Sequence, residues 1–163
     1  MIFKIYYIYN IMKLCPNSNF RGHLVEGQWV FGGTEHRESG DSKRCFMVPI
    51  SDRKATTLLP IIQQYILPGS IIMSDCWKAY EGIGRLDFEH YTVNHSENYK
   101  DPITGACTNT IEGSWRHLKR SLPLNVRKGD YSPYLAEYLW RRKNQGQDLF
   151  KLFCIDIGRF YKK

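Results

Sequence analysis

The stretch Ile71-Ile72-Met73-Ser74-Asp75, followed directly by Cys76-Trp77-Lys78-Ala79-Tyr80, decides the fold of this chain. Its first part is a short apolar run of the kind that forms a buried strand, and its second part is typical of a helix. An aspartate therefore stands where a central strand gives way to a helix. Carboxylates on such rigid elements can hold the divalent metals of phosphoryl-transfer sites.

The rest of the chain supplies strands mostly before this stretch and helices after it. Runs of β-branched and aromatic residues predict strands at Ile2–Tyr9, Gln28–Thr34, Arg44–Ile50, Ser70–Ser74 and Tyr91–Val93. Helical spacing predicts helices at Asp52–Ile66, Asp75–Ile83 and Asn109–Ser121, around Tyr131–Leu139, and at Leu149–Phe160. Loops are expected at Leu14–His23, Glu35–Lys43 (a hairpin connection) and Glu97–Ala106. Pro60 lies inside the predicted helix Asp52–Ile66, and the sequence leaves open whether that helix is straight or kinked there.

This order of elements predicts the architecture. An antiparallel start of three strands, followed by alternating helices and strands, gives a mixed α/β sheet covered by helices. It is the element order of the ribonuclease H-like fold. The 163 residues suit one domain, 1–163, with a real core.

Composition excludes several classes of protein. With 42% hydrophobic and 14% aromatic residues the chain is globular rather than disordered. No apolar run approaches the roughly 20 residues that a membrane span needs, so no membrane partner is expected. The five cysteines form no C-x-x-C pair, which argues against a zinc ribbon and favours reduced thiols in the cytosol or nucleus.

A second acid, Glu112, stands near the start of the helix Asn109–Ser121. With Asp75 it forms a candidate pair of metal ligands, because magnesium prefers carboxylate oxygens. The alternative is that both acids are helix caps: Asp75 is a favoured N-cap, and Glu112 follows Asn109 by three positions as in a capping box. The two roles are compatible at a helix start.

Two-metal sites usually need a third carboxylate on the first strand, and this strand carries none. It reads Ile5-Tyr6-Tyr7-Ile8-Tyr9-Asn10. Glu26 and Asp41 are candidate substitutes, although neither lies on that strand. The missing acid therefore decides whether the protein is an enzyme.

The net charge of +7 is compatible with nucleic-acid binding, and equally with a solvated positive face. The candidates for contact with a DNA backbone are Arg116, Lys119, Arg120, Arg141 and Arg142. The plainer alternatives are an i,i+4 ion pair between Glu112 and Arg116, and a charged last turn of the later helix. We expect His95 and His117 to be structural or surface residues, and the four tryptophans to be core residues.

Several blocks together resemble the Merlin-type DDE transposases, which are similar to a group of bacterial insertion-sequence transposases. They are Arg21-Gly22-His23, Val25–Gly33, Thr57–Ile62, Ser74–Tyr80, Val93–Ser96, Thr108–Glu112 and Trp115–Arg120. The resemblance extends from about Arg21 to the helix with Leu139-Trp140-Arg141-Arg142. It implies a ribonuclease H-like catalytic domain that cuts and joins transposon ends with Mg²⁺ or Mn²⁺, with a homo-oligomer as a further possibility.

The resemblance also assigns residues. The family's second acid matches Asp75 and its third matches Glu112, and counting back without gaps from Arg21-Gly22-His23 places its first acid at Asn10. The DNA-binding region that precedes the family's catalytic domain is not expected here. The chain is therefore interpreted as a truncated, catalytically impaired transposase domain, nuclear if eukaryotic and otherwise cytoplasmic. The alternatives are a non-catalytic DNA- or protein-binding module, and an unrelated basic α/β domain.

Overall fold

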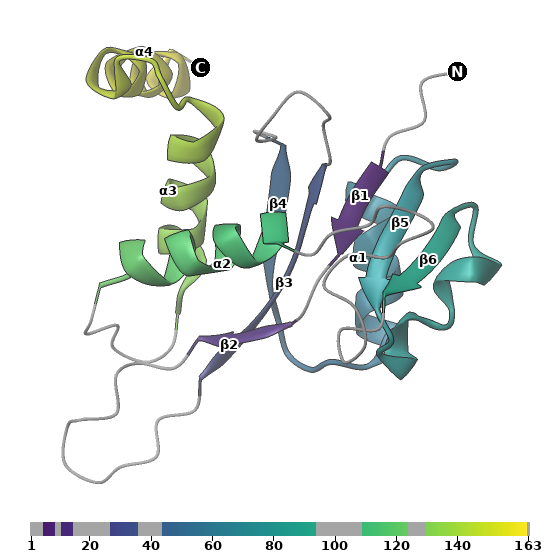
Figure 1. Ribbon diagram of the computed structural model, residues 1–163. Coiled ribbons are helices and arrows are strands. Elements are labelled where there is room, and N and C mark those ends of the chain that lie inside the picture. The colour runs from purple at the N-terminus through teal and green to yellow at the C-terminus, as the bar shows by residue number, and fades with distance from the viewer. Residues whose placement is uncertain are drawn as a thin grey trace, which may run out of the picture.

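A six-stranded mixed sheet forms the centre of the computed structural model, which describes residues 5–8, 11–14, 27–35, 44–93, 109–123 and 130–162 (Figure 1). Its strands are β1 (Ile5–Ile8), β2 (Met12–Leu14), β3 (Gln28–Glu35), β4 (Cys45–Ile50), β5 (Ile71–Asp75) and β6 (Glu89–Val93). The hydrogen-bonded order is β2-β3-β1-β5-β6, and β4 also pairs with β3. β2 pairs with the first part of β3, and β1 pairs with its last part. The predicted mixed α/β architecture is confirmed.

The directions of the strands fix which ends meet. β3 is antiparallel to β1, β2 and β4, whereas β5 is parallel to both β1 and β6. The carboxyl ends of β1 and β5 therefore lie at the same end of the sheet as the amino end of β3. Asp75 ends β5 there, and Trp29 stands near the start of β3.

Apolar side chains alternate between the two faces of the sheet, as the pleat requires. On one face Phe31, Phe46 and Ile72 pack in a cluster with buried residues of the helix α1 (Ala55–Tyr65). On the other face Val30 and Met73 pack in a second cluster with residues of two later helices. Two core clusters thus enclose the sheet.

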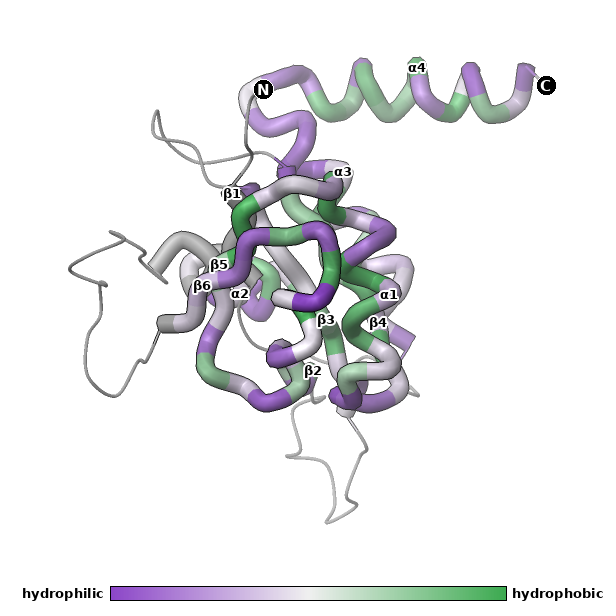
Figure 2. The backbone as a smooth tube through the Cα atoms, turned by 90° about the vertical axis from the view of Figure 1, so that its right-hand side faces the viewer, coloured by the Kyte–Doolittle hydropathy of each residue, from purple (hydrophilic) through white to green (hydrophobic). Residues whose placement is uncertain are grey.

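Three helices follow the sheet: α2 (Asn109–Ser121), α3 (Ser132–Lys143) and α4 (Leu149–Tyr161). Trp115 and Leu118 of α2, with Leu135 of α3, are buried in the second cluster. α4 has no buried residue and extends away from the sheet, as Figure 2 shows. None of the helices in the described part of the chain is both long and apolar enough to cross a membrane.

α1 begins later than the sequence predicts and does not break at its proline. The helix runs without interruption from Ala55 to Tyr65 with Pro60 inside it. Asp52 lies before the helix, where its carboxylate accepts hydrogen bonds from the backbone N–H of Lys54 (2.9 Å) and the hydroxyl of Thr57 (2.7 Å). These two bonds, with the Lys54 charge, lower the pKa of Asp52.

The helix predicted at Asp75–Ile83 is wrong. Asp75 still belongs to β5, and two short 3₁₀ turns follow, η1 (Lys78–Tyr80) and η2 (Ile83–Arg85). The chain is extended at Trp77, and Gly82 approaches α1 so closely that an added Cβ would lie 2.7 Å from a methyl carbon of Leu59. Gly82 inside the predicted range and Gly84 directly after it disfavour a regular helix.

β2 is a further difference, because Met12 and Lys13 follow the predicted strand and Leu14 begins the predicted loop. It pairs with β3 through Met12↔Val30 and Leu14↔Gln28, whereas β1 pairs through Ile8↔Gly33. Glu35, expected in the hairpin connection, is the last residue of β3, and its N–H donates to the carbonyl of Arg44 (3.0 Å). The helices predicted at Asn109–Ser121 and Leu149–Phe160 are confirmed, the latter extending to Tyr161. The remaining parts of the predicted loops at 15–23, 36–43 and 97–106 lie outside the described residues.

Candidate functional site

Asp75 lies at the carboxyl end of β5 and is half-buried. Its Oδ1 accepts a hydrogen bond from the backbone N–H of Trp77 (3.3 Å). The carboxylate thus bonds to the backbone two residues later, as in an Asx turn rather than in the N-cap of an α-helix. Asp75 thus bonds to the backbone that follows it, as the capping alternative states, but it does not cap an α-helix.

Ser74 and His90 fix the end of β5 beside Asp75. The fully buried hydroxyl of Ser74 lies 2.9 Å from the carbonyl oxygen of Asp75 and 2.8 Å from Nε2 of His90 on β6. When that hydroxyl donates to the carbonyl, Nε2 must carry the proton that completes the second bond. Burial lowers the pKa of His90, which favours this neutral ring.

Tyr80 returns from η1 to the core beneath this end of the sheet. Its side chain is buried, and its ring lies 6.4 Å from that of Phe31. Burial raises the pKa of the phenol, and the nearby Asp75 carboxylate raises it further. The block Asp75-Cys76-Trp77-Lys78-Ala79-Tyr80 therefore holds its aspartate at the surface by anchoring its tyrosine in the core.

The strand beside Asp75 is β1, paired through Tyr7↔Met73. Asp75 is two residues beyond Met73, so an equal count from Tyr7 leads to position 9, whereas the sequence resemblance selects position 10. Tyr9 and Asn10 both lie outside the described residues. Neither position holds an acid, because residues 1–25 contain neither Asp nor Glu.

The other proposed ligands lie partly or wholly outside the described residues. Glu112 is on α2, but its side chain is not among those described; Glu26 and Asp41 are not described at all. The buried acid of the sheet, Glu35, pairs with Tyr6 at the opposite end of β1 and lies 3.7 Å from the Arg44 guanidinium. Since Tyr6 also pairs with Ile72, Glu35 is displaced from Asp75 by roughly 10 Å along the strands alone. It cannot replace the missing ligand.

The described side chains alone offer a metal ion an incomplete donor set. Among the described residues no group of three or more His, Cys, Asp or Glu side chains is placed to hold one. Asp75 supplies one carboxylate, and the first strand supplies none. Two dications need several negative ligands to offset their charge, so the described side chains alone do not fit a two-metal site.

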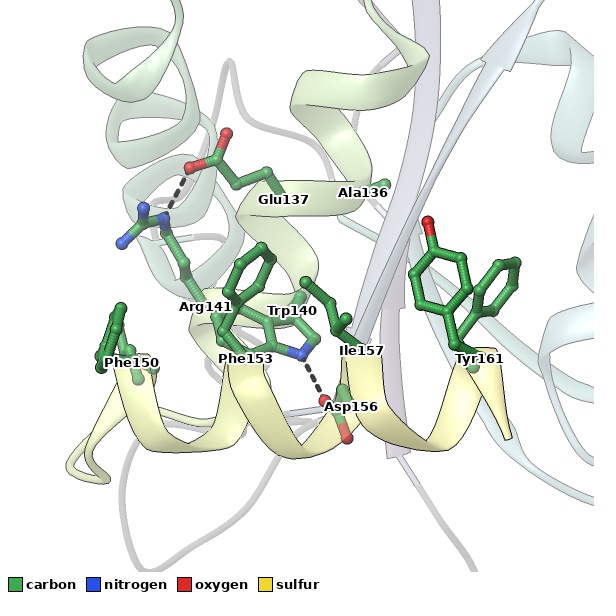
Figure 3. A pocket seen from close by; sticks show the side chains of 11 residues that line it. Ala136, Glu137, Trp140, Arg141, Phe150, Phe153, Asp156, Ile157 and Tyr161 are labelled. Carbon is green, nitrogen blue, oxygen red and sulfur yellow. Dashed lines mark hydrogen bonds and ion pairs between the residues drawn. The ribbon is translucent and has the colours of Figure 1, made fainter. Parts of the chain in front are cut away.

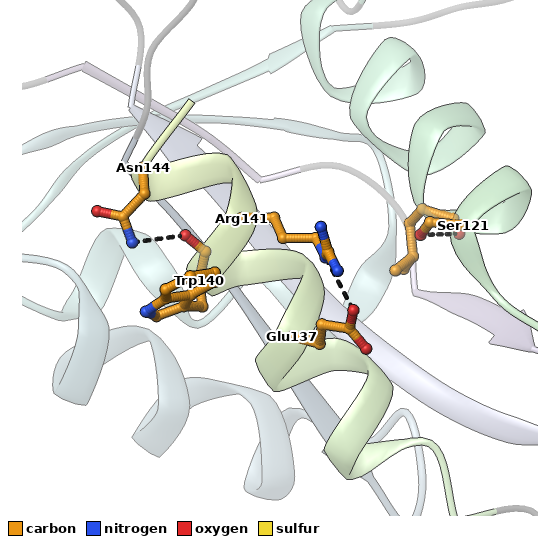
Figure 4. Close-up of polar contacts among 6 residues, drawn as sticks. Ser121, Glu137, Trp140, Arg141 and Asn144 are labelled. Atoms are coloured by element: carbon orange, nitrogen blue, oxygen red, sulfur yellow. Dashed lines mark hydrogen bonds and ion pairs between the residues drawn. The ribbon is translucent and has the colours of Figure 1, made fainter. Parts of the chain in front are cut away.

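The predicted DNA-contacting residues differ in availability. Arg116, Lys119 and Arg120 are exposed on α2. On α3, Arg141 is held by Glu137 through a 2.8 Å ion pair between Nε and Oε1 (Figure 4). Arg142 is half-buried. Exposed basic side chains therefore lie on both helices, and on α3 the charge of Arg141 is offset by Glu137.

A cluster of aromatic and basic side chains was missed by the sequence analysis. Trp77 is 43% exposed, which contradicts the expectation that all four tryptophans are core residues. The Arg53 guanidinium carbon lies 4.4 Å from the centre of the Trp29 ring and 4.8 Å from that of Trp77. Lys13 also lies over the Trp29 ring, with its Nζ 5.4 Å from the ring centre. We call Lys13, Trp29, Arg53 and Trp77 the tryptophan–arginine stack.

The stack joins four segments that are far apart in the sequence, so no local spacing could reveal it. Trp115, by contrast, is 7% exposed and lies in the core, as expected. His117 is exposed, which agrees with the expectation of a surface histidine. His95 lies outside the described residues.

Comparison with known proteins gives three similarities. Residues 19–143 match the model of the ISXO2-like transposase domain. A protein of Haemophilus influenzae described as an uncharacterized transposase-like protein is 30% identical over 103 residues, covering 62% of this chain and 82% of the relative. The crystal structure of the catalytic core domain of BIV integrase superposes with a TM-score of 0.53 at 14% identity, covering 96% of this chain and 97% of the integrase chain. At that identity the likeness concerns the fold alone.

Proposed function

Because the chain belongs to the ISXO2-like transposase domain family, we propose that it is a DDE-type catalytic domain for DNA cleavage and strand transfer whose activity is impaired. Membership of this family rules out the unrelated basic α/β domain. We further infer that the domain is ribonuclease H-like and of the Merlin type within the transposases. The integrase-like fold and the sequence blocks around Asp75 and Glu112 support these two inferences.

The absence of an acid from the first strand carries the proposal. β1 lies directly beside β5, so a carboxylate near its end would approach Asp75. No acid precedes Glu26 in the sequence, whichever of positions 9 and 10 is the equivalent one. Asparagine offers an amide oxygen but no negative charge, and that charge is what offsets the dications.

The place of α2 supports the pairing of Asp75 with Glu112. Along β5, Asp75 alternates in phase with Met73, which belongs to the cluster that contains Trp115 of α2. Position 112 is three residues before Trp115, one turn earlier on the helix. The proposed roles are therefore metal ligation by Asp75 and Glu112, with Mg²⁺ or Mn²⁺ bound weakly at most.

A nicking assay on supercoiled DNA with Mg²⁺ or Mn²⁺ tests the proposal. We expect little metal-dependent nicking by the unmodified chain, and an increase on the order of 10²-fold in Asn10→Asp or in Tyr9→Asp, the size of effect that one electrostatic stabiliser contributes. Adding Asp75→Asn to the active variant should abolish the gain. Robust Asp75-dependent nicking by the unmodified chain would contradict the impairment.

The second candidate function is a non-catalytic DNA-binding module. The observation that favours it is the exposure of Arg116, Lys119 and Arg120 on α2 in a chain of net charge +7. DNA binding without nicking in the unmodified chain and in both restored variants would favour this module over an impaired enzyme.

A further inference from the structure

The tryptophan–arginine stack is the first feature that the proposed function leaves unexplained. Its arginine, Arg53, is exposed and lies between β4 and α1. The nearest acid in sequence, Asp52, is engaged by Lys54 and Thr57. Among the described residues no carboxylate forms an ion pair with Arg53. The positive charge is held over two indole rings instead.

Such an arrangement prepares an arginine for an anion. Ring contacts restrict the guanidinium, so less conformational freedom is lost when its N–H groups form hydrogen bonds. The N–H groups of a guanidinium that the rings leave uncovered can still donate to the oxygens of a phosphate, to which a guanidinium can bind in a bidentate fashion. Lys13 adds a second positive charge at the same tryptophan.

The stack also lies at the functional end of the sheet. Trp29 is near the start of β3, and this end of β3 lies in the direction in which the carboxyl ends of β1 and β5 point. Trp77 follows Asp75 by two residues and donates its backbone N–H to that carboxylate. We propose that Arg53, held by Trp29 and Trp77, binds a phosphodiester group of DNA that lies across this end of the sheet. The inference rests on the proposed function in requiring DNA as the substrate.

Fluorescence anisotropy with a labelled duplex of mixed sequence, titrated at several NaCl concentrations, tests this site. We expect Arg53→Gln to weaken binding about tenfold and to reduce the slope of log affinity against log salt by about one. Arg53→Lys should recover the slope but not the full affinity, since lysine keeps the charge without the planar fork. The matched control is Arg85→Gln on η2, an exposed arginine outside the stack, which should change neither quantity.

The outcomes separate the two proposals. If the unmodified chain binds the duplex and Arg53→Gln behaves like Arg85→Gln, the phosphate site is wrong while DNA binding stands. If the unmodified chain binds no DNA, both proposals are wrong. Inorganic phosphate at matched ionic strength should compete no better than chloride; selective displacement by phosphate would show a site for the free ion instead of the DNA backbone.

α4 supplies a second, independent inference. One side of this helix carries an apolar stripe of Leu149, Phe150, Phe153, Ile157, Phe160 and Tyr161. The stripe and α3 line an open groove of about 1100 Å³ (Figure 3). Within the groove, the Trp140 indole donates to Asp156 (3.0 Å) and packs edge-on against Phe153. Trp140 thus covers the middle of the stripe and leaves both ends open.

The open ends are unusually apolar for a surface. Phe150 is 77% exposed, Phe160 76% and Tyr161 79%, and Phe153 is 53% exposed. At about 150–250 Å² per ring, the exposed parts of these four rings amount to roughly 400–700 Å². A standard protein–protein interface buries about 800 Å² on each partner, so this stripe alone supplies most of one.

The spacing of the stripe indicates the partner. Read from either end, its positions recur in the same order, because 149 and 161, 150 and 160, and 153 and 157 are equidistant from 155. An antiparallel copy would therefore place Phe150 of one chain against Phe160 of the other. It would also bring Asp148 toward Lys162, an opposite charge. A two-fold interface requires this self-complementarity. We infer that α4 pairs antiparallel with α4 of a second copy of this chain.

Sedimentation equilibrium of the full chain tests the pairing. We expect a dimer at micromolar concentrations, and monomers when either Phe150→Lys or Phe160→Glu is introduced alone. The double variant should regain the dimer, because antiparallel pairing sets each lysine against a glutamate of the other chain. The control Leu67→Asp replaces a residue that is 56% exposed after α1, and it should remain dimeric.

Three results would overturn the α4 pairing. They are a monomeric unmodified chain at tens of micromolar, a loss of the dimer in Leu67→Asp equal to that in Phe160→Glu, and failure of the double variant to associate. Unchanged circular dichroism of the single variants would show that lost association does not reflect unfolding.

Discussion

α1 and α4 carry the same kind of apolar pattern and have opposite surroundings. Leu58 and Ile62 of α1 are fully buried against the sheet, whereas α4 buries no residue. Both helices follow an aspartate whose carboxylate accepts backbone hydrogen bonds: Asp52 bonds to Lys54 before α1, and Asp148 accepts from the Lys151 N–H (3.1 Å) at the start of α4. Local signals are thus alike, and the surface that each stripe faces makes the difference.

Two glycine substitutions test that difference with one chemical change. Gly33 lies on β3, where an added Cβ would stand 2.6 Å from the Phe46 ring, which stacks on Tyr65 of α1. Gly33→Ala should therefore lower the free energy of unfolding by about 1–3 kcal/mol through overpacking. Gly158 lies in α4 with nothing within 4 Å of an added Cβ, so Gly158→Ala should stabilise that helix by about 0.5–1 kcal/mol.

Urea unfolding at low protein concentration, followed by circular dichroism, measures both glycine variants. Hydrogen exchange of α4 amides reports the Gly158 effect separately if that helix opens locally. A similar loss of stability in both variants would mean that α4 is packed as tightly as the sheet, and the contrast between the two helices would be wrong.

A smaller effect distinguishes the sheet from α4 by pH. Burial lowers the pKa of His90 in the folded chain, so the unfolded chain binds more protons near the ordinary histidine value of 6.5. His90 thus contributes stability that is fully present above that value and is lost as pH falls through it toward the lower, folded pKa. α4 contains no histidine.

We therefore expect the urea midpoint to fall between about pH 7.5 and 5.5, and to fall less in His90→Gln, whose amide can still hydrogen-bond to Ser74. This window stays above the titration of Asp52, whose lowered pKa contributes stability that is lost only at more acidic pH. An equal fall in both proteins would assign the effect to other histidines.

Much of the sheet could be predicted because its signals are local. Apolar runs marked β3, β4 and β5, and the helical spacing of Trp115 and Leu118 marked α2. The 3₁₀ turns after Asp75 could not be predicted, because Trp77, Lys78 and Tyr80 have an acceptable helical pattern. Gly82 approaches Leu59 of α1 in these turns, and such a contact between distant segments leaves no local signal.

The candidate site divides in the same way. The sequence alone marks Asp75 and Glu112 and shows that no acid precedes Glu26. The contact of Arg53 with Trp29 and Trp77 has no sequence signal. The three residues stand in β3, after β4 and after β5, and they meet only when the sheet assembles.

The sequence by itself determined the types of most elements, the family resemblance and the lack of a first acid, since these depend on residue identity and short-range spacing. Only the tertiary structure decided that β5, which ends at Asp75, lies beside β1. It also decided that Arg53 is held by two tryptophans and that the stripe of α4 stays exposed. The physical reason is that burial and cation–π contacts depend on which surfaces meet, and pairing across the sheet brings together residues that the chain keeps apart.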